Sequence, residues 1–582
     1  MFREYFQTEL AYLRELGLEF ARANPELTDI FSERGGDPDV QRLLEGFAFL
    51  SARIRERIND AIPEVVESLA RLLLPHYLRS IPAFSVVEFS PAPNALRKRH
   101  RLARGTEISS RPVGATNCLF RTTADLDLLP LSIESTVVEE PSASRPLIRL
   151  RFRSGAHALE SVIAPGGIPV YLHGPLAQTA TLHLWFQRYL IDATYRNAQG
   201  QSFLIESFRA TPLSLQPDFG LLPWPDRSPE GPRLLQEYFA LPQKMLFLRF
   251  DGLQSIPLAM ATERFDLVFR FDRPPELAER IETGTFRLNC VPVVNLFDTD
   301  ADPIRRDDCM KEYLLRVSGF DQLHSDVYSV QSVMGIRGRG RKRIVYTPFV
   351  DFEHAATEPE NRAYYTLRSV QSPIDNMLDT YISVFAPAAG DGGPVEETLS
   401  IELTGTNRML AAALRTGDIS LATPRSPAFA SFRNLPGVTV PVCPPVGSEL
   451  YWRLIAYLAI NFPSLNDRET LRSLLSLYNF HDSVRQQQGR ANQLRVDAIR
   501  RVEMKPTKRL LGDIPLLGIA TTLEIEEAQF ASVGDAFLFG CTLDSLFAAQ
   551  VPINSFNQLS VQLYPSSTVL AWPPRNGDQP IL

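Results

Sequence analysis

The segment Phe265-Asp-Leu-Val-Phe-Arg-Phe-Asp272 places an apolar side chain at every second position. Successive side chains of a β-strand point to opposite faces of the sheet. The odd-numbered positions would therefore form one apolar face, made of Phe265, Leu267, Phe269 and Phe271. The pattern predicts a half-buried strand and indicates that the fold contains β-sheet.

The same period of two recurs from about residue 84 onward. Residues 147–153 alternate in the same way, and further strand candidates are 182–190, 245–250, 286–297, 399–403 and 496–527. Breaks rich in Pro and Gly, such as Pro165–Pro169 and Pro223–Pro225, separate them. This arrangement is typical of β-sandwich-like or mixed β-rich domains joined by long loops.

The first 80 residues follow a helical period instead. Apolar residues recur at spacings of three and four from Phe2 to Phe20, and Asn24-Pro25 ends that helix. A second helix begins with Asp37 as a capping residue and Pro38 at the first helical position. A third is expected at 63–74. The apolar stripe of the second helix consists of Val40, Leu43, Leu44, Phe47, Leu50, Ile54 and Ile58.

This stripe has two interpretations. It packs against the protein's own body, or it enters a helix bundle shared with another subunit, and the spacing alone does not separate the two. We treat its seven apolar residues as the candidate subunit-interface helix.

The predicted fold class is α+β with several domains. An N-terminal helical segment (residues 1–82) precedes a β-rich, sandwich-like middle region (83–385) of one or two subdomains. The stretch 386–398, dense in Pro and Gly, is the candidate linker, and 399–582 form a mixed α/β region. Helices are expected there at 451–460, after a capping box at Ser464–Asp467, and at 535–550.

Composition narrows the class of protein. The chain has 582 residues, 44% hydrophobic and 22% charged, with a formal net charge of -7, so neither disorder nor nucleic-acid wrapping is favoured. Its five cysteines are odd in number and form no C-x-x-C, which argues against a disulfide framework or a zinc site. No signal peptide and no apolar run of about 20 residues is visible, so a cytoplasmic location without direct membrane insertion is expected.

Sequence motifs for catalysis or cofactor binding are lacking, so no catalytic, cofactor-binding or metal-binding residue is predicted. Asp298–Asp302 opens like a calcium loop, but Pro303 and Cys309 stand where the loop needs Gly and Glu. His173 and His183 would be at most two ligands across a hairpin. The basic run 337–343 is interpreted as an exposed loop; a solvated loop or one facing an acidic partner is favoured over contact with phosphate or nucleic acid, because the chain is acidic overall.

Several segments resemble, in order, one family. They are Tyr12–Phe20, Asp37–Leu50, Pro63-Glu64, Leu74–Leu78 with Ile81-Pro82, Glu237–Pro242, Asn289–Phe297, Thr406–Arg408, Trp452–Ile455, Asn554–Phe556, and Trp572-Pro-Pro574 with Gly577. Each motif is weak by itself, but their ordered set is similar to the TssF (VasA/ImpG) family of type VI secretion baseplate subunits.

The resemblance implies a structural wedge subunit and no enzyme activity or cofactor. Two copies would pair around one TssG subunit, with TssK and TssE, and six wedges would surround the VgrG hub. The baseplate would dock on the membrane complex and support growth of the tail tube and contractile sheath. Alternatives are the equivalent wedge subunit of a phage or phage-like contractile particle and, more remotely, a β-rich carbohydrate-active enzyme.

Overall fold

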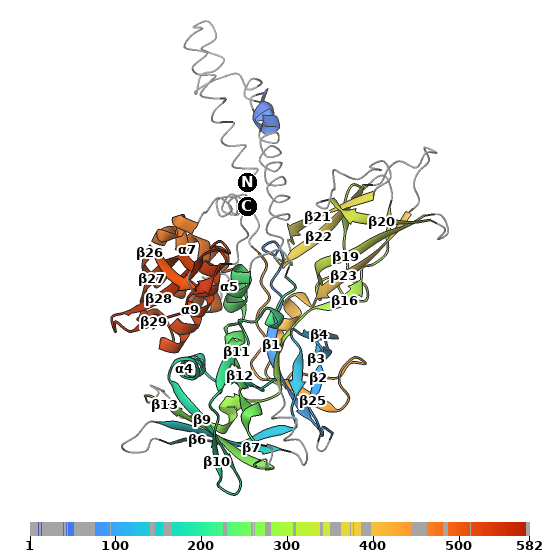
Figure 1. Cartoon of the computed structure of the whole chain (residues 1–582). Helices are drawn as coiled ribbons and strands as arrows, with labels where there is room; N and C mark the ends of the chain where they lie inside the picture. Colours follow the sequence, from blue (N-terminus) through green and yellow to red (C-terminus); the bar gives the residue numbers. More distant parts are fainter. Residues whose placement is uncertain are drawn as a thin grey trace, which may run out of the picture. The chain divides into compact units, whose positions relative to one another are not determined.

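Figure 1 shows the computed structural model of the chain. It describes residues 10, 13, 39, 42–43, 45–51, 76–92, 95–139, 146–154, 166–224, 230–257, 260, 262–273, 281–306, 310–337, 342–349, 363–372, 374–375, 377–385, 397–444, 462–480, 487–511 and 514–577. The helices expected at 2–20, 63–74 and 451–460 lie outside these residues, except for Leu10 and Leu13, which are helical.

The chain forms two compact units. One comprises Met1–Leu78 together with Pro445–Ala459, and the other comprises Arg79–Pro444 together with Ile460–Leu582. A short segment from the C-terminal half thus joins the N-terminal residues, which the order of the sequence does not predict. Within the described residues, all named strands belong to the second unit.

The six-stranded sheet assembles strands from distant parts of the chain. Strand β1, next to the edge of this sheet, pairs antiparallel with β15 on one side and with the edge strand β25 on the other. The order is β24 (Ile419–Leu421), β3 (Glu107–Val113), β4 (Thr116–Thr122), β15 (Cys290–Val294), β1 (Phe84–Pro91) and β25 (Ala430–Asn434). A small separate ladder joins β2 (His100–Leu102) to β5 (Leu126–Leu128). Residues of the predicted C-terminal region therefore complete a sheet of the middle region.

The strand that opened the sequence argument is confirmed as β13 (Arg264–Phe271), whose four odd-numbered apolar side chains are buried. It lies in a five-stranded sheet with β10 (Ser202–Leu204), β9 (Leu190–Asn197), β7 (Leu147–Ser154) and β6 (Leu131–Glu139). The neighbouring four-stranded sheet contains β11 (Arg209–Pro212), β12 (Phe247–Asp251), β8 (Ile168–Leu172) and β14 (Phe286–Arg287).

The strand expected at 182–190 is wrong. Those residues form the second half of helix α4 (Leu176–Arg188), and β9 begins only at Leu190. The helix is buried on nearly every side, from Gln178 to Phe186, so it shows no one-sided apolar stripe. A short apolar run of this kind cannot be assigned to helix or strand by periodicity.

The eight-stranded sheet carries its own core. β17 (Ile304–Arg306) pairs with β23, and the other strands are, in order, β16 (Phe297–Asp300), β23 (Glu397–Thr406), β19 (Asp326–Arg337), β20 (Lys342–Pro348), β21 (Ala363–Gln371), β22 (Leu378–Phe385) and β18 (Tyr313–Leu314). One face buries side chains such as Val333, Ile382 and Leu403.

The candidate linker 386–398 runs between β22 and β23, two strands of this same sheet. Its last two residues, Glu397 and Thr398, already belong to β23, and the other residues lie outside those described. The expected boundary at 398/399 therefore cuts through a strand. The sequence signal was a Pro/Gly-rich loop, which marks a connection between strands as readily as one between domains.

The C-terminal part combines a sheet with helices (Figure 1). Its strands are β26 (Ile499–Leu511), β27 (Ile514–Glu526), β28 (Phe556–Tyr564), β29 (Val569–Ala571) and β30 (Arg575–Asn576). Helix α9 (Val533–Ala548) confirms the helix expected at 535–550 and is buried along almost its whole length. It packs against α4, α5 (Glu230–Ala240) and β28.

Helix α7 (Arg468–Leu477) begins three residues later than the predicted capping box implies. Residues 462–466 form a 3-10 turn, so Asp467 becomes the N-cap, and its carboxylate accepts the Thr470 amide at 2.8 Å. The apolar face that was predicted for this helix is confirmed, since Leu471, Leu474, Leu475 and the following Tyr478 are buried. Helix α8 (Gln487–Asp497) then leads into β26.

Candidate functional site

The candidate interface helix is described at residues 42–43 and 45–51. Leu43, Phe47 and Leu50 are 63%, 64% and 59% exposed, whereas Ala48 is completely buried. Because successive residues of a helix are rotated by about 100°, Ala48 lies on a different side of the helix from Leu43, Phe47 and Leu50. Leu43, Phe47 and Leu50 thus share an accessible apolar face of this helix. Val40, Leu44, Ile54 and Ile58 lie outside the described residues.

Two of the family-like motifs meet in a buried junction between the six-stranded and eight-stranded sheets. Asn295 follows β15 and Asn407 follows β23, 112 positions later. The Asn295 amide nitrogen donates to the Leu119 carbonyl at 2.7 Å and to Asn407 Oδ1 at 2.8 Å. The side-chain Oδ1 of Asn295 accepts hydrogen bonds from the backbone amide of Asn407 at 2.7 Å and from the Thr406 hydroxyl at 3.1 Å. The Leu119 amide in turn donates to Asn407 Oδ1 at 2.9 Å.

Arg408, next to Asn407, adds ion pairs to this junction. Its backbone has a φ of 49°, in the left-handed region, and its side chain is buried. The guanidinium binds Asp375 at 2.7 Å and Asp379 at 3.3 Å, both in or next to β22. Burial raises the pKa of the nearby Asp326 to about 7, although the charge of Arg408 lowers it. No sequence motif indicated that Asp326, Asp375 and Asp379 lie together.

The motif at 237–242 anchors α5. The Glu237 carboxylate accepts the Leu221 amide at 2.7 Å and forms an ion pair with Lys244, and both charged side chains are fully buried. The hydroxyl of the next residue, Tyr238, donates to Asp535 of α9, which also pairs with Arg495 of α8 at 3.1 Å. The motif therefore ties three helices together and has no free nucleophile or base.

The C-terminal motif packs its Trp572 side chain closely against helix α9. Trp572 stacks on Phe537 of α9 with ring centroids 5.3 Å apart, and its indole nitrogen donates to Cys541 Sγ at 3.4 Å. A Cβ added at Gly540 would come within 2.2 Å of the indole. Glycine in the middle of this helix is therefore required by the close approach of the ring rather than by the backbone conformation.

The basic run 337–343 does not begin as an exposed loop. Arg337 is the last residue of β19, and its guanidinium binds the buried Glu397 at 3.3 Å. Glu397 also binds Arg306 at 3.1 Å and the Tyr346 hydroxyl at 2.9 Å. Gly335 leaves room for this carboxylate, because an added Cβ would lie 1.8 Å from it. The pairing gives Arg337 a structural role, and residues 338–341 lie outside the description.

The other polar motifs are also structural. Asp298 and Asp300 lie in β16 and not in a loop, and Asp298 Oδ1 accepts Gln331 at 2.9 Å and the Thr404 hydroxyl at 3.1 Å. His183 lies on α4, so the expected hairpin with His173 is wrong. Burial lowers the pKa of His183 to about 3, so the imidazole is neutral. Within the described residues, no three His, Cys, Asp or Glu side chains are grouped as metal ligands.

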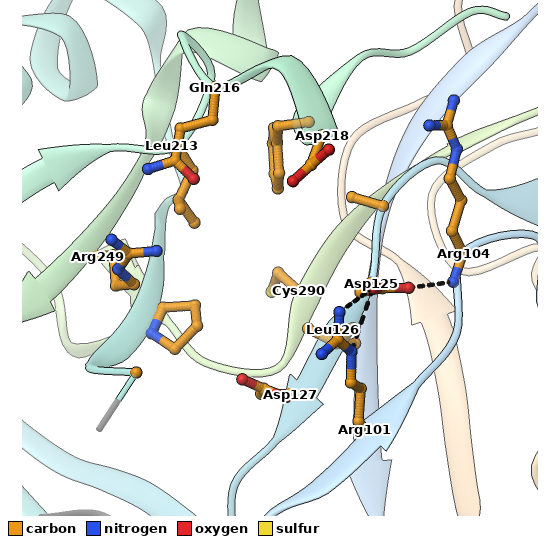
Figure 2. Close-up of a pocket in the computed structure, with 14 residues that line it drawn as sticks. Arg101, Arg104, Asp125, Leu126, Asp127, Leu213, Gln216, Asp218, Arg249 and Cys290 are labelled. Carbon is orange, nitrogen blue, oxygen red and sulfur yellow. Dashed lines mark hydrogen bonds and ion pairs between the residues drawn. The ribbon is translucent and has the colours of Figure 1, made fainter. Parts of the chain in front are cut away.

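Figure 2 shows a pocket of about 310 Å³ where charged side chains gather. Asp125, Asp127 and Asp218 line it, as do Arg101 and Arg104. Asp125 accepts the Arg104 amide at 2.7 Å and pairs with Arg101, and hydrogen bonds from Arg101 hold the pKa of Asp125 below its ordinary value. A general acid in glycoside hydrolysis needs a raised pKa, so this carboxylate does not fit that role.

The residues described so far connect strands and helices through buried hydrogen bonds, ion pairs and ring contacts. Leu43, Phe47 and Leu50 form one accessible apolar face on a helix. No helix in the described part of the chain has both the length and the apolar character needed to cross a membrane. This arrangement suits a structural protein that assembles with other chains.

Comparison with known proteins agrees with this picture. The family model described as Type VI secretion system, TssF matches residues 1–579. The Type VI secretion system component TssF1 of Pseudomonas aeruginosa PAO1 is 30% identical over an alignment of 626 residues, which covers 100% of this chain and 99% of that protein.

Two solved assemblies contain similar chains. The TssK-TssF-TssG baseplate subcomplex of a type VI secretion system, solved by cryo-electron microscopy, includes a chain with 31% identity and a TM-score of 0.78, covering 93% of this chain and 99% of that one. A second chain, from the baseplate complex of the type VI secretion system, is 28% identical with a TM-score of 0.65 over the full length of both. These relatives are structural baseplate components and not enzymes. The chain belongs to the TssF family of type VI secretion system baseplate subunits.

Proposed function

We propose that this chain is a wedge subunit that assembles with a TssG-type and a TssK-type partner. The observation that carries the proposal is the exposed apolar face of Leu43, Phe47 and Leu50. The similar chain in the TssK-TssF-TssG subcomplex supports the choice of partners. In this proposal the face enters a helix bundle with the TssG-type subunit.

In this proposal the composition and location of the complete baseplate are those of the TssF family. Two copies of the chain flank one TssG-type subunit, and the wedge also binds TssE and surrounds the VgrG hub. The completed baseplate lies in the bacterial cytoplasm, docked on the inner-membrane complex, where it supports the tail tube and contractile sheath. The chain takes part as a scaffold and uses no cofactor.

The energy available from the helical face is sufficient for specific binding. Complete burial of a large apolar side chain contributes about 1.5–3 kcal/mol, and each of the three is roughly 60% exposed before binding. Their burial would contribute about 4 kcal/mol in total, equivalent to roughly a thousandfold in affinity. Two aspartates in this face should therefore abolish a micromolar interaction.

The test is co-expression of the full chain with its TssG-type partner. The double substitution Leu43→Asp and Phe47→Asp should remove the partner from the purified complex, while Leu204→Asp, at a 47% exposed leucine of β10, should leave it unchanged. Circular dichroism checks that each variant is folded. Full partner recovery by a folded double variant would contradict the assignment of this face.

A further inference from the structure

The hairpin of β26 and β27 is longer than the sheet that supports it. The two strands pair over their whole length, up to Leu511 opposite Ile514. β28 pairs with β27 only from Gly518 to Glu526. Residues 508–511 and 514–517 therefore form a two-stranded arm beyond the end of β28.

One face of the arm continues the buried face of the sheet. Antiparallel partners share a face, and the even-numbered residues of β26 alternate with the odd-numbered ones. At the base of the hairpin, Val502 and its partner Leu523 are 8% and 0% exposed. On the arm, Leu510 and Leu517 of the same face are 70% and 61% exposed. Lys508 pairs with Leu517, and Leu510 pairs with the exposed Pro515.

The apolar pattern thus extends past the point where the described chain covers it. A two-stranded ribbon with an uncovered apolar face is marginally stable in water. Exposed apolar patches with polar neighbours are typical of interaction sites. The arm fits a segment that is completed by another chain.

Strand addition is not the mode that this arm favours. β26 is the edge strand of its sheet and carries Lys505, Pro506 and Lys508. Proline has no N–H to donate, and lysines on an edge oppose pairing with a further strand. The partner is therefore expected on the face of the ribbon and not along its edge.

Charge and geometry define the partner. The charged residues in the described part of the arm are Lys508 and Arg509, both exposed, so an acidic surface complements it. Helices α7 and α8 already lie beside the base of β26. From Pro506 to Leu510 the face is about 13 Å long at 3.3 Å per residue, which matches about two and a half turns of helix.

We propose that the apolar face of the arm, formed by Lys508, Leu510, Pro515 and Leu517 together with the adjoining Pro506, receives an acidic amphipathic helix of a partner chain. This inference rests on the proposed function, because the helix comes from another subunit of the baseplate. Leucines enter the apolar stripe of that helix, and Lys508 faces its acidic flank.

The test places a photo-crosslinking amino acid at position 517 in the full chain, co-expressed with the TssG-type and TssK-type partners. The mass of the complex is measured first, which tests the proposed function independently. In an assembled complex, cross-links to a partner helix with acidic residues are expected. The same probe at Val569, 61% exposed on β29 at the other side of the sheet, should give few. Cross-links confined to this chain, or to a partner strand, would overturn the inference.

A second measurement needs no complex. A fluorescent helical peptide of Leu and Glu should bind the purified chain, and a matched peptide of Leu and Lys should not. Leu510→Glu with Leu517→Glu should weaken binding about 100-fold, and Lys508→Glu about tenfold with loss of salt dependence. Val569→Glu is the control. Equal binding of both peptides, or an unchanged affinity in the double variant, would reject the acidic-helix partner.

Discussion

The junction of Asn295 and Asn407 should control how firmly the six-stranded and eight-stranded sheets are joined. Replacement of Asn295 by Ala removes four hydrogen bonds from a fully buried site. It leaves the Asn407 amide and the Leu119 carbonyl without these partners. At about 1–3 kcal/mol for each unsatisfied buried group, the loss is about 4 kcal/mol. That is a large share of the stability of an ordinary domain, which is about 5–15 kcal/mol.

Native-state hydrogen exchange of the Leu119 and Asn407 amides measures this loss directly, since both donate to side-chain oxygens of the junction. At 1.4 kcal/mol per factor of ten, exchange should become about a thousandfold faster in the Asn295→Ala variant. Asn576→Ala, at an exposed position of β30, is the control and should change exchange little. A change below threefold at both amides would show that the junction does not couple the two sheets.

Three further substitutions test other buried groups. Since the folded-state pKa of Asp326 is raised from 3.8 to about 7, its contribution to stability is present below pH 4 and is lost as the pH rises toward 7. Asp326→Asn should therefore raise the melting temperature more at pH 8 than at pH 4, and an equal shift at both pH values would contradict the burial argument. Lys244→Met removes the nearer of the two cations that pair with the buried Glu237, leaving only Arg233 at 4.0 Å, and should destabilise by about 3 kcal/mol in urea unfolding. A loss below 1 kcal/mol would mean that the pair is not coupled. Gly540→Ala should lower stability by about 1–3 kcal/mol in the same assay, because the new methyl group meets Trp572. A gain, as expected for an unhindered helix position, would refute the close packing.

Local patterns predicted much of the fold. The apolar spacing in α7 reflects burial of one side of the helix, and the alternation in β13 reflects one wholly apolar face; such faces can be read from the sequence. The strand was expected to be half-buried, but Asp266 and Val268 of its other face are buried as well. Helix α4 was missed because it is covered on nearly all sides and has no polar face to set its period. The start of α7 was displaced because the chain uses a 3-10 turn ahead of Asp467.

The junctions could not be predicted from the sequence. Asn295 and Asn407 are 112 positions apart, and a polar residue after a strand looks the same whether it is solvated or bonded across two sheets. Likewise, the basic character of Arg337 suggested a surface loop, since nothing in the sequence pairs it with Glu397, 60 residues later. Resemblance to a family identified the motifs, and the structure gives several of them a physical role in holding strands and helices together.

The exposed face of the N-terminal helix remains a prediction with a direct test. The central claim is that this chain is a scaffold that assembles through that face with a TssG-type subunit. Light scattering of the co-purified complex measures its mass and therefore its composition. The account predicts a stable particle with two copies of this 65.3 kDa chain for each TssG-type subunit. A monomer that elutes apart from the partner, at concentrations where both are folded, would contradict it.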